Sequence, residues 1–225
     1  MRLEIASSKA VKYACLNFHY AKAMPVNTFG YSVFNDKNEW CGVILYGSGA
    51  SANIGKPFGL KQGEIIELVR MALNGKQGIT TKCMALSMKL IKKQIPLCKL
   101  LISYADFWQG HYGIIYQATN WYYIGESQAQ ANVIDPYTGK ELHKRSAVGK
   151  YGSCVGLKYG EIKYKLKYIY PLDKNMIPLC ESLKKPYPKI AQEVNQDKRD
   201  ASSIEIGGSN PTLALNLQAK NRQHG

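Results

Sequence analysis

Asp106 is the residue whose position most suggests chemistry. It follows Ser103-Tyr104-Ala105 at the end of a predicted buried strand, and Gln109-Gly110-His111 come shortly after it. In open α/β sheets, ligands bind in the crevice beyond the carboxyl ends of the strands. A carboxylate there can accept a proton from an attacking amine, or orient the amine. The alternative is that Asp106 only caps the helix that follows.

A second group runs from Tyr116 to Gly125. A tyrosine four residues before a helix-ending polar residue and an aromatic, then a strand closing at glycine, resembles the Y-x-x-x-G-F-x-x-x-G pattern of GNAT-type acyltransferases. Asn120 replaces the first glycine, and both residues tolerate the left-handed conformation that ends a helix. Trp121 replaces the phenylalanine. The resemblance implies that Tyr116 protonates a leaving thiolate and that Gln109 contacts a pantetheine arm. Otherwise Tyr116 is a core aromatic with a locally bonded hydroxyl.

The turn between a predicted strand and helix, Asn74 to Thr80, is the third group. Backbone N–H groups at a glycine-bearing turn that opens a helix commonly hold phosphates. An ordinary connecting turn with two glycines is the alternative. The turn resembles the GNAT pyrophosphate loop but lacks its leading side chain and last glycine. With acetyl-CoA or a related acyl donor as cofactor, the predicted contacts are Val69, Met71, Lys76, Gln77, Gly78, Gln109 and Asn120.

Four segments together resemble the Mom family of bacteriophage. They are NFHYAKAMP, GVILYGSGASANIGKPFGLKQGEIIELVRMAL, SYADFWQGHYGIIYQATNWYYIG and HKRSAVGKYGS, which span about residues 17–153 in the family's order. Members resemble GNAT-type acyltransferases in fold. They are associated with converting adenine in double-stranded DNA to N6-carbamoylmethyladenine, which protects phage DNA from host restriction.

The resemblance implies a reacting centre of His19, Tyr20, Tyr104 and Asp106, to which we add Ser103. Taken alone, a single histidine such as His19 would be structural. The resemblance also implies a metal, iron in particular, for which His19 and Asp106 would be the ligands because imidazole and oxygen suit such an ion. Adenine N6 is stacked and paired in a duplex, so the base must be flipped into a pocket. Aromatic residues near 104–123, with Phe58, could stack on it.

The charge of the chain favours a polyanionic partner. Thirty Lys and Arg against sixteen Asp and Glu give +14. Seven basic and five acidic residues lie from Glu181 onward, so residues 1–180 hold 23 and 11, a net +12. Such a field favours nucleic acid, although anionic membranes and acidic proteins attract it equally. The predicted DNA contacts are Lys56, Lys61, Lys144, Arg145 and Lys150.

The elements that would position these residues alternate between strand and helix. We predict an α/β, GNAT-like acyltransferase fold, with a mixed central sheet and helices on both faces. The expected helices are about 9–22, 80–94 and 110–119, and the expected strands are 28–35, 40–47, 65–73, 97–104, 121–125 and 162–168.

The organisation of the chain predicts one catalytic domain, residues 1–183, and a disordered tail, residues 184–225, that is polar and poor in aromatics. The six cysteines have no C-x-x-C spacing and are expected to be reduced and structural. No apolar run could span a bilayer, so we expect no membrane partner and a soluble protein in the cytoplasm of the bacterial host.

Two alternatives to DNA modification stay open. A generic acyl-CoA-dependent N-acyltransferase acting on a small amine or a protein predicts an intact pyrophosphate loop. A non-catalytic DNA-binding protein would leave the Asp106 group and the Tyr116 to Gly125 pattern unexplained.

Overall fold

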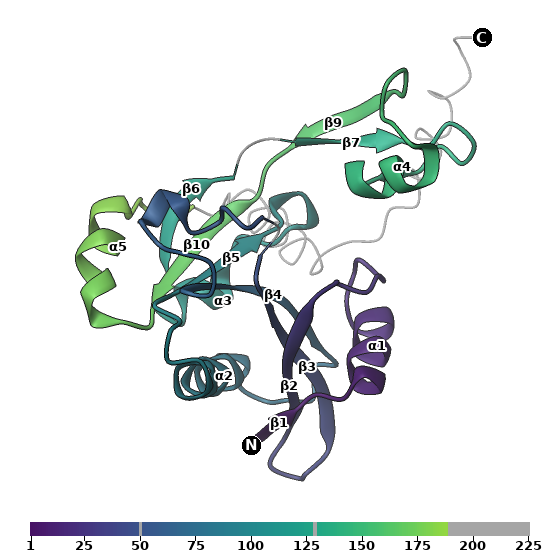
Figure 1. The fold of residues 1–225 in the computed structure, drawn as a ribbon. Coiled ribbons are helices and arrows are strands. Elements are labelled where there is room, and N and C mark those ends of the chain that lie inside the picture. Colours follow the sequence, from purple (N-terminus) through teal and green to yellow (C-terminus); the bar gives the residue numbers. More distant parts are fainter. Residues whose placement is uncertain (50, 128–129, 189–225) are drawn as a thin grey trace, which may run out of the picture. The chain divides into compact units, whose positions relative to one another are not determined.

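A seven-stranded sheet forms the centre of the structure, a computed structural model that describes residues 1–49, 51–127 and 130–188 (Figure 1). Its strand order is β1-β2-β3-β4-β5-β10-β6. Only β4 and β5 pair in parallel, and every other neighbouring pair is antiparallel. The strands are β1 (Arg2–Ile5), β2 (Thr28–Phe34), β3 (Trp40–Gly47), β4 (Ile65–Leu73), β5 (Leu100–Ala105), β6 (Tyr122–Glu126) and β10 (Leu166–Pro171).

Helices cover both faces of this sheet, because apolar side chains alternate along its strands. Ile44 and Tyr46 of β3 pack with α2 (Thr80–Gln94), whereas Val43 and Leu45 pack with α1 (Ser8–Asn17) on the other face. The short helix α5 (Ile177–Leu183) packs with Leu100 and Ile102 of β5 and with Ile169 of β10, on the face that α2 does not cover. The predicted mixed sheet with helices on both faces is confirmed.

Strand β4 contains one extra residue. Its pairing with β3 runs from Leu45↔Arg70 to Tyr46↔Leu68, so Val69 has no partner and forms a β-bulge. The bulge changes which side chains face α2. Ile66 and Leu68 belong to the α2-side core before it, and Met71 and Leu73 pack there after it.

Strands β4 and β5 separate soon after they begin to pair. Their parallel register runs from Ile65↔Leu100 to Leu68↔Ser103 and then stops, although β4 continues to Leu73. The edge of β4 that faces away from β3 therefore has no strand partner beyond Leu68. This gap between the two strands is the feature that positions the site.

A second, three-stranded sheet has the order β8-β7-β9. Its strands are β7 (Gln130–Ile134), β8 (Glu141–Leu142) and β9 (Tyr159–Lys163), and α4 (Lys144–Tyr151) packs on it. We call residues 130–163 the arm. The 3-10 turns η1 (Lys56–Phe58), η2 (Phe107–Gln109) and η3 (Lys174–Met176), with the single turn α3 (Ile114–Gln117), complete the described elements.

Several predicted elements differ from the structure. The first helix ends at Asn17 rather than residue 22, and the Lys22 ammonium donates to the Asn17 carbonyl at its end. The helix expected at 110–119 is only α3, because Gly110 and Gly113 adopt left-handed conformations, φ 72° and 77°. The strand expected at 162–168 is two strands, β9 and β10, in different sheets.

Other expectations concern the chain as a whole. All six cysteines are free, and all but the half-buried Cys154 are buried. Among the described residues, no helix is both long and apolar enough to cross a membrane. Residues 1–188 form one compact unit. Most of the predicted tail lies outside the described residues, so the boundary at 183 stays a prediction.

Candidate active site

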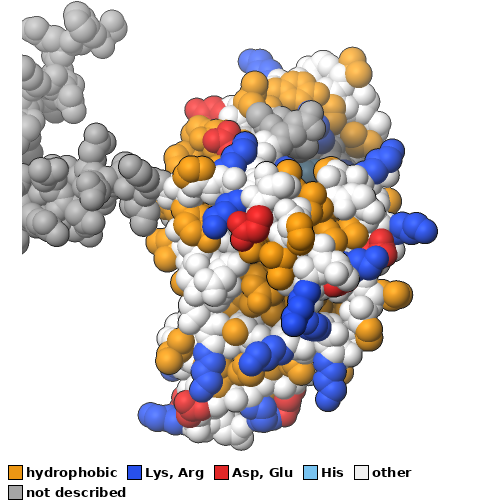
Figure 2. All heavy atoms as spheres, turned by 90° about the vertical axis from the view of Figure 1, so that its left-hand side faces the viewer, with side chains coloured by type: hydrophobic (Ala, Val, Ile, Leu, Met, Phe, Trp, Pro, Cys, Tyr) orange, Lys and Arg blue, Asp and Glu red, His pale blue; other side chains and the backbone are white. Residues whose placement is uncertain are grey.

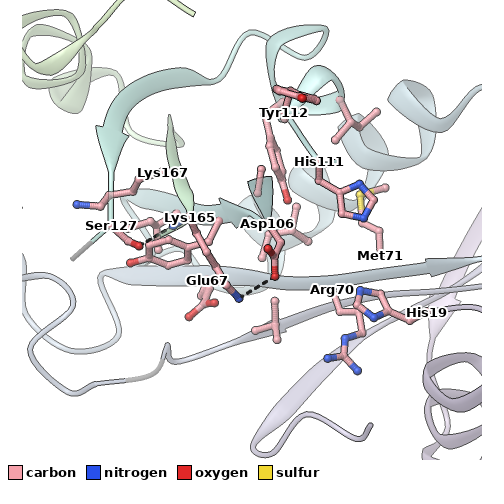
Figure 3. A pocket seen from close by; sticks show the side chains of 18 of the residues that line it. His19, Glu67, Arg70, Met71, Asp106, His111, Tyr112, Ser127, Lys165 and Lys167 are labelled. Atoms are coloured by element: carbon pink, nitrogen blue, oxygen red, sulfur yellow. Dashed lines mark hydrogen bonds and ion pairs between the residues drawn. The ribbon is translucent and has the colours of Figure 1, made fainter. Parts of the chain in front are cut away.

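One cavity of about 1110 Å³ opens at the gap between β4 and β5 (Figure 3). Side chains from both faces of the sheet line it. Gln77, Thr80 and Tyr116 approach from the α2 side, whereas Phe58 and Tyr104 approach from the opposite side. The cavity therefore connects the two faces through the sheet, where a donor and an acceptor could meet.

Asp106 lies at the carboxyl end of β5 and lines this cavity. Its side chain makes no capping hydrogen bond to η2, so the interpretation of Asp106 as a simple helix cap is wrong. The Tyr20 hydroxyl lies 3.5 Å from Asp106 Oδ2 and donates to it. The carboxylate, 21% exposed, also meets the Lys165 ammonium at 3.9 Å (Figure 3).

Two imidazole rings lie close to Tyr20, the tyrosine that contacts Asp106. The Tyr20 ring lies 4.2 Å from the His19 ring and 5.2 Å from the His111 ring, between ring centroids. Burial, and then the positive charge of Arg70, lowers the pKa of His19 to about 4. His19 is therefore neutral near pH 7, and its Nδ1 accepts a hydrogen bond from the Ala21 backbone at 3.2 Å.

Tyr116 lines the cavity from the α2 side, and its hydroxyl belongs to a short chain of hydrogen bonds. The Ser103 hydroxyl lies 2.7 Å from the Leu68 carbonyl oxygen and 2.8 Å from the Tyr116 hydroxyl. A carbonyl can only accept, so the single hydrogen of Ser103 goes to Leu68, and Tyr116 then donates to Ser103. Burial raises the pKa of Tyr116 to about 12. The phenol is thus protonated at neutral pH.

The start of α2 forms the floor of the cavity on that same side. Ile79 precedes the helix without a side-chain cap, so the first N–H groups keep their capacity to bind an anion. Gln77 is only 9% exposed; its Nε2 donates to Thr80 Oγ1 at 2.8 Å, while its Oε1 is buried without a partner. Since amide O and N are assigned from their partners, either end of Gln77 can meet a ligand here.

The predicted cofactor contacts divide into two groups. Val69, Met71 and Gln77 line the cavity. Lys76, Gly78, Gln109 and Asn120 are exposed and do not line it. Asn120 instead has φ 60°, the left-handed conformation expected of it. Trp121, which follows it, is fully buried in the core.

The predicted DNA contacts lie outside the cavity, and two of them are engaged elsewhere. The Lys150 ammonium pairs with the buried Asp135 carboxylate at 2.6 Å, which gives it a structural role in the arm. The Lys144 ammonium lies 5.3 Å from the centre of the Tyr159 ring. Lys56 and Lys61 lie in or beside η1, and Arg145 lines a smaller hollow of about 230 Å³.

Several cavity residues were not among the predicted site residues. Arg70, Glu67 and His111 line it, as do three lysines on alternate positions of the chain from β9 to β10, Lys163, Lys165 and Lys167. The alternation of Lys with apolar residues over 162–168 is visible in the sequence, but in a strand it shows only that the lysines share one face. Lys and Arg side chains also spread over the face shown in Figure 2, without gathering in one patch.

The donor groups do not fit an iron site. Among the described residues, no three His, Cys, Asp or Glu side chains come together as a metal-binding group. His19 also has Arg70, Lys165 and Lys22 as its charged neighbours, and all of them oppose a further positive charge. We therefore assign no metal to His19 and Asp106.

Comparison with known proteins gives one sequence family and several distant structures. Residues 1–189 match the Mom protein family. No curated protein matches the chain. The fold is similar to smu.2055 from Streptococcus mutans UA159, with 13% identity, a TM-score of 0.45, and coverage of 77% of this chain and 100% of that chain.

Two further solved structures are similar at the same low level. FeeM, an N-acyl amino acid synthase from uncultured soil microbes, shows 12% identity and a TM-score of 0.44 over 82% of this chain and 100% of that chain. An acetyltransferase from Bacillus subtilis in complex with CoA shows 10% identity and a TM-score of 0.40 over 76% and 97%.

Proposed function

Because the chain belongs to the Mom protein family, we propose that it is a transferase that converts adenine N6 in double-stranded DNA to a carbamoylmethyl derivative. By the family resemblance, this product protects phage DNA from host restriction. One observation carries the proposal. A carboxylate, Asp106, and a phenol, Tyr116, line one cavity that passes through the sheet between two separated strands.

The acceptor side of this cavity is the side of Asp106. A duplex adenine must leave the stack to reach it. N6 is a weak nucleophile, because its lone pair is delocalised into the ring. Asp106 orients N6 and accepts its proton, while the Tyr20 hydroxyl holds one carboxylate oxygen.

The donor side fits acetyl-CoA or a related acyl donor. The unpaired edge of β4 beyond Leu68 offers backbone groups to an amide-containing arm. The uncapped start of α2, with Gln77, offers donors to a diphosphate. A bound donor of this class supplies the activated carbon. Acetyl transfer alone would give an N-acetyl adenine, so the carbamoylmethyl product requires a modified donor or a further step.

Tyr116 is the proton donor in this arrangement. A pKa of about 12 keeps its hydroxyl protonated at neutral pH, so it can protonate a leaving group as an acid. Ser103 accepts from Tyr116 in the resting enzyme and can turn to donate to the phenolate that proton transfer leaves. The pair thus stabilises both states of Tyr116.

Double-stranded DNA is the proposed partner because the field of the protein is strongly positive, with a formal charge of +14. Lys144 and Arg145 at the start of α4, with Lys56 and Lys61 beside η1, would contact phosphates and release counterions. The phosphate contact we proposed for Lys150 is weakened by its pairing with Asp135.

The test is mass spectrometry of nucleosides from the DNA of cells that express the chain. We expect a modified deoxyadenosine that disappears with Asp106→Asn and persists with Glu161→Gln, a matched change at an exposed acid of β9. Only unmodified deoxyadenosine, from folded and soluble protein, would overturn the proposal. An acylated small amine or protein instead would favour a generic N-acyltransferase, and protection from restriction that survives Asp106→Asn would favour a DNA-binding protein.

A further inference from the structure

The chain passes between the central sheet and the arm at two places. One lies after β6, at Ser127, and the other lies between β9 and β10, at Lys165. Two hydrogen bonds tie them together: the Lys165 N–H donates to Ser127 Oγ at 2.9 Å, and the Ser127 N–H donates to the Lys165 carbonyl at 2.7 Å. We call this pair of residues the neck. It holds the Lys165 backbone in place from both its N–H and its C=O.

The strand register then places Lys165 opposite Asp106. Strands β10 and β5 are antiparallel with Leu166↔Ala105 as their last pair, and one step further along each chain lie Lys165 and Asp106. The register makes the two backbones neighbours. The Lys165 ammonium, at the end of a side chain that is 52% exposed, lies 3.9 Å from Asp106 Oδ2 (Figure 3).

Two other cations that line the cavity, Lys163 and Arg70, have partners other than Asp106. The Lys163 ammonium pairs with Glu141 at 2.8 Å, and the Arg70 guanidinium donates to the Ala23 carbonyl. Lys165 is the cation that pairs with Asp106, and it shares oxygen Oδ2 with the Tyr20 hydroxyl. Both contacts on one oxygen leave Oδ1 to face an incoming amine.

We infer that Lys165 is a positioning residue for Asp106 and that the neck holds Lys165 in place. The position of the arm then controls the orientation of the Asp106 carboxylate. The inference rests on the proposed function, in which Asp106 accepts the N6 proton. Loss of Lys165 should therefore lower the rate of modification more than it lowers the affinity for DNA. A shift of the arm that breaks the neck would carry Lys165 away from Asp106.

The test compares Lys165→Met, Lys165→Arg and Ser127→Ala with Lys158→Met, a matched charge loss at an exposed position just before β9. Modified deoxyadenosine is measured at early times after induction, per amount of soluble protein. Affinity of each purified variant for a fluorescent DNA duplex and its melting temperature are measured in parallel.

We expect Lys165→Met to lower the modification rate about tenfold or more, the scale of a misplaced catalytic group, while duplex affinity falls by less than about fivefold, because at most one phosphate contact is lost. Lys165→Arg should restore most of the rate, Ser127→Ala should lower it without removing a charge, and Lys158→Met should match the wild type. A Lys165→Met rate within twofold of wild type, or a rate loss fully matched by lost duplex affinity, would overturn the inference. A wild-type chain that modifies no adenine would overturn the proposed function, and the inference with it.

Discussion

Replacing Tyr116 by Phe separates the proposed proton donor from the packing around it. The substitution removes one hydroxyl and leaves the ring against Trp121 and Tyr168, whose centroids lie 5.2 Å and 5.0 Å away. Ser103 keeps its 2.7 Å hydrogen bond to the Leu68 carbonyl, because that bond uses the serine's own hydrogen. The fold therefore loses one hydrogen bond and gains no unpaired buried donor.

The magnitudes of the two effects differ widely. Loss of one hydrogen bond lowers the free energy of unfolding by about 0.5–1.5 kcal/mol. Loss of a general acid lowers the rate by about 10²–10⁴-fold, which corresponds to about 3–5 kcal/mol in the activation barrier. Ser103→Ala should lower stability more and the rate less than Tyr116→Phe does. It leaves both the Leu68 carbonyl and the Tyr116 hydroxyl without their partner, and each loss costs stability.

The assay is the appearance of modified deoxyadenosine in the DNA of expressing cells, combined with urea denaturation of the purified variants. Tyr170→Phe is the control, because it removes a phenol hydroxyl from a residue that packs on the same core cluster and contacts Trp121 but does not line the cavity. A Tyr116→Phe variant that folds and modifies DNA within about threefold of the wild-type rate would refute the assignment of Tyr116 as the acid.

Three further outcomes follow from the charges on the molecule. Lys144→Ala combined with Arg145→Ala should make the plot of log affinity for duplex DNA against log salt less steep by about 2, near 0.9 for each lost phosphate contact; an unchanged slope would place the DNA elsewhere. Lys150→Met should lower the urea midpoint at pH 7, because the Lys150 ammonium holds the pKa of the Asp135 carboxyl well below its ordinary value. The stability that this ion pair contributes is fully present above the ordinary carboxyl pKa and is lost progressively as the pH falls below it. The urea midpoints of wild type and variant should therefore converge in acid, and a constant difference would contradict the pairing. The pKa of His19, lowered to about 4 from 6.5, means that the unfolded chain takes up a proton first as the pH falls. His19→Gln should therefore lose less stability than wild type between pH 7 and pH 4.5 in urea denaturation, and equal losses would show that the imidazole is not held neutral.

The sequence predicts well those elements that one stretch of chain determines by itself. The strand over Ile65–Leu73 and the helix over Thr80–Gln94 have the predicted bounds. A largely apolar run, interrupted by Glu67 and Arg70, ends at a glycine turn, and Pro96 follows the helix. The Mom-family resemblance is confirmed, and so is the mixed central sheet with helices on both faces. Asp106 at the end of its strand also followed from local pattern alone.

Features that depend on which strands become neighbours were beyond the sequence pattern. Residues 162–168 alternate apolar and basic side chains without a break, yet the chain leaves one sheet at Lys163 and enters the other at Leu166. A period of two is the same in either sheet, so it could not show the change. The pairing of β10 with β5 is what brings Lys165 to Asp106.

The contact of His111 with Tyr20 depends on the same kind of long-range placement. The two residues are 91 positions apart in the chain, and no local spacing relates them. The iron expectation finds no support among the described residues for a related reason, since residue types alone do not reveal that Arg70, Lys165 and Lys22 lie near His19.

The unpaired residue at Val69 acts on the path of the β4 backbone, because the residues on both sides of it keep one continuous register with β3. Before it, even-numbered side chains point to the α2 side; after it, odd-numbered ones do, as Ile66 and Met71 show. Removing that one residue would make Leu68↔Tyr46 and Arg70↔Leu45 successive pairs of a regular strand, and the side chains from Arg70 to Leu73 would keep their present faces. What would be lost is the bend and extra twist that a bulge gives its strand, at the point just after Leu68 where β4 parts from β5.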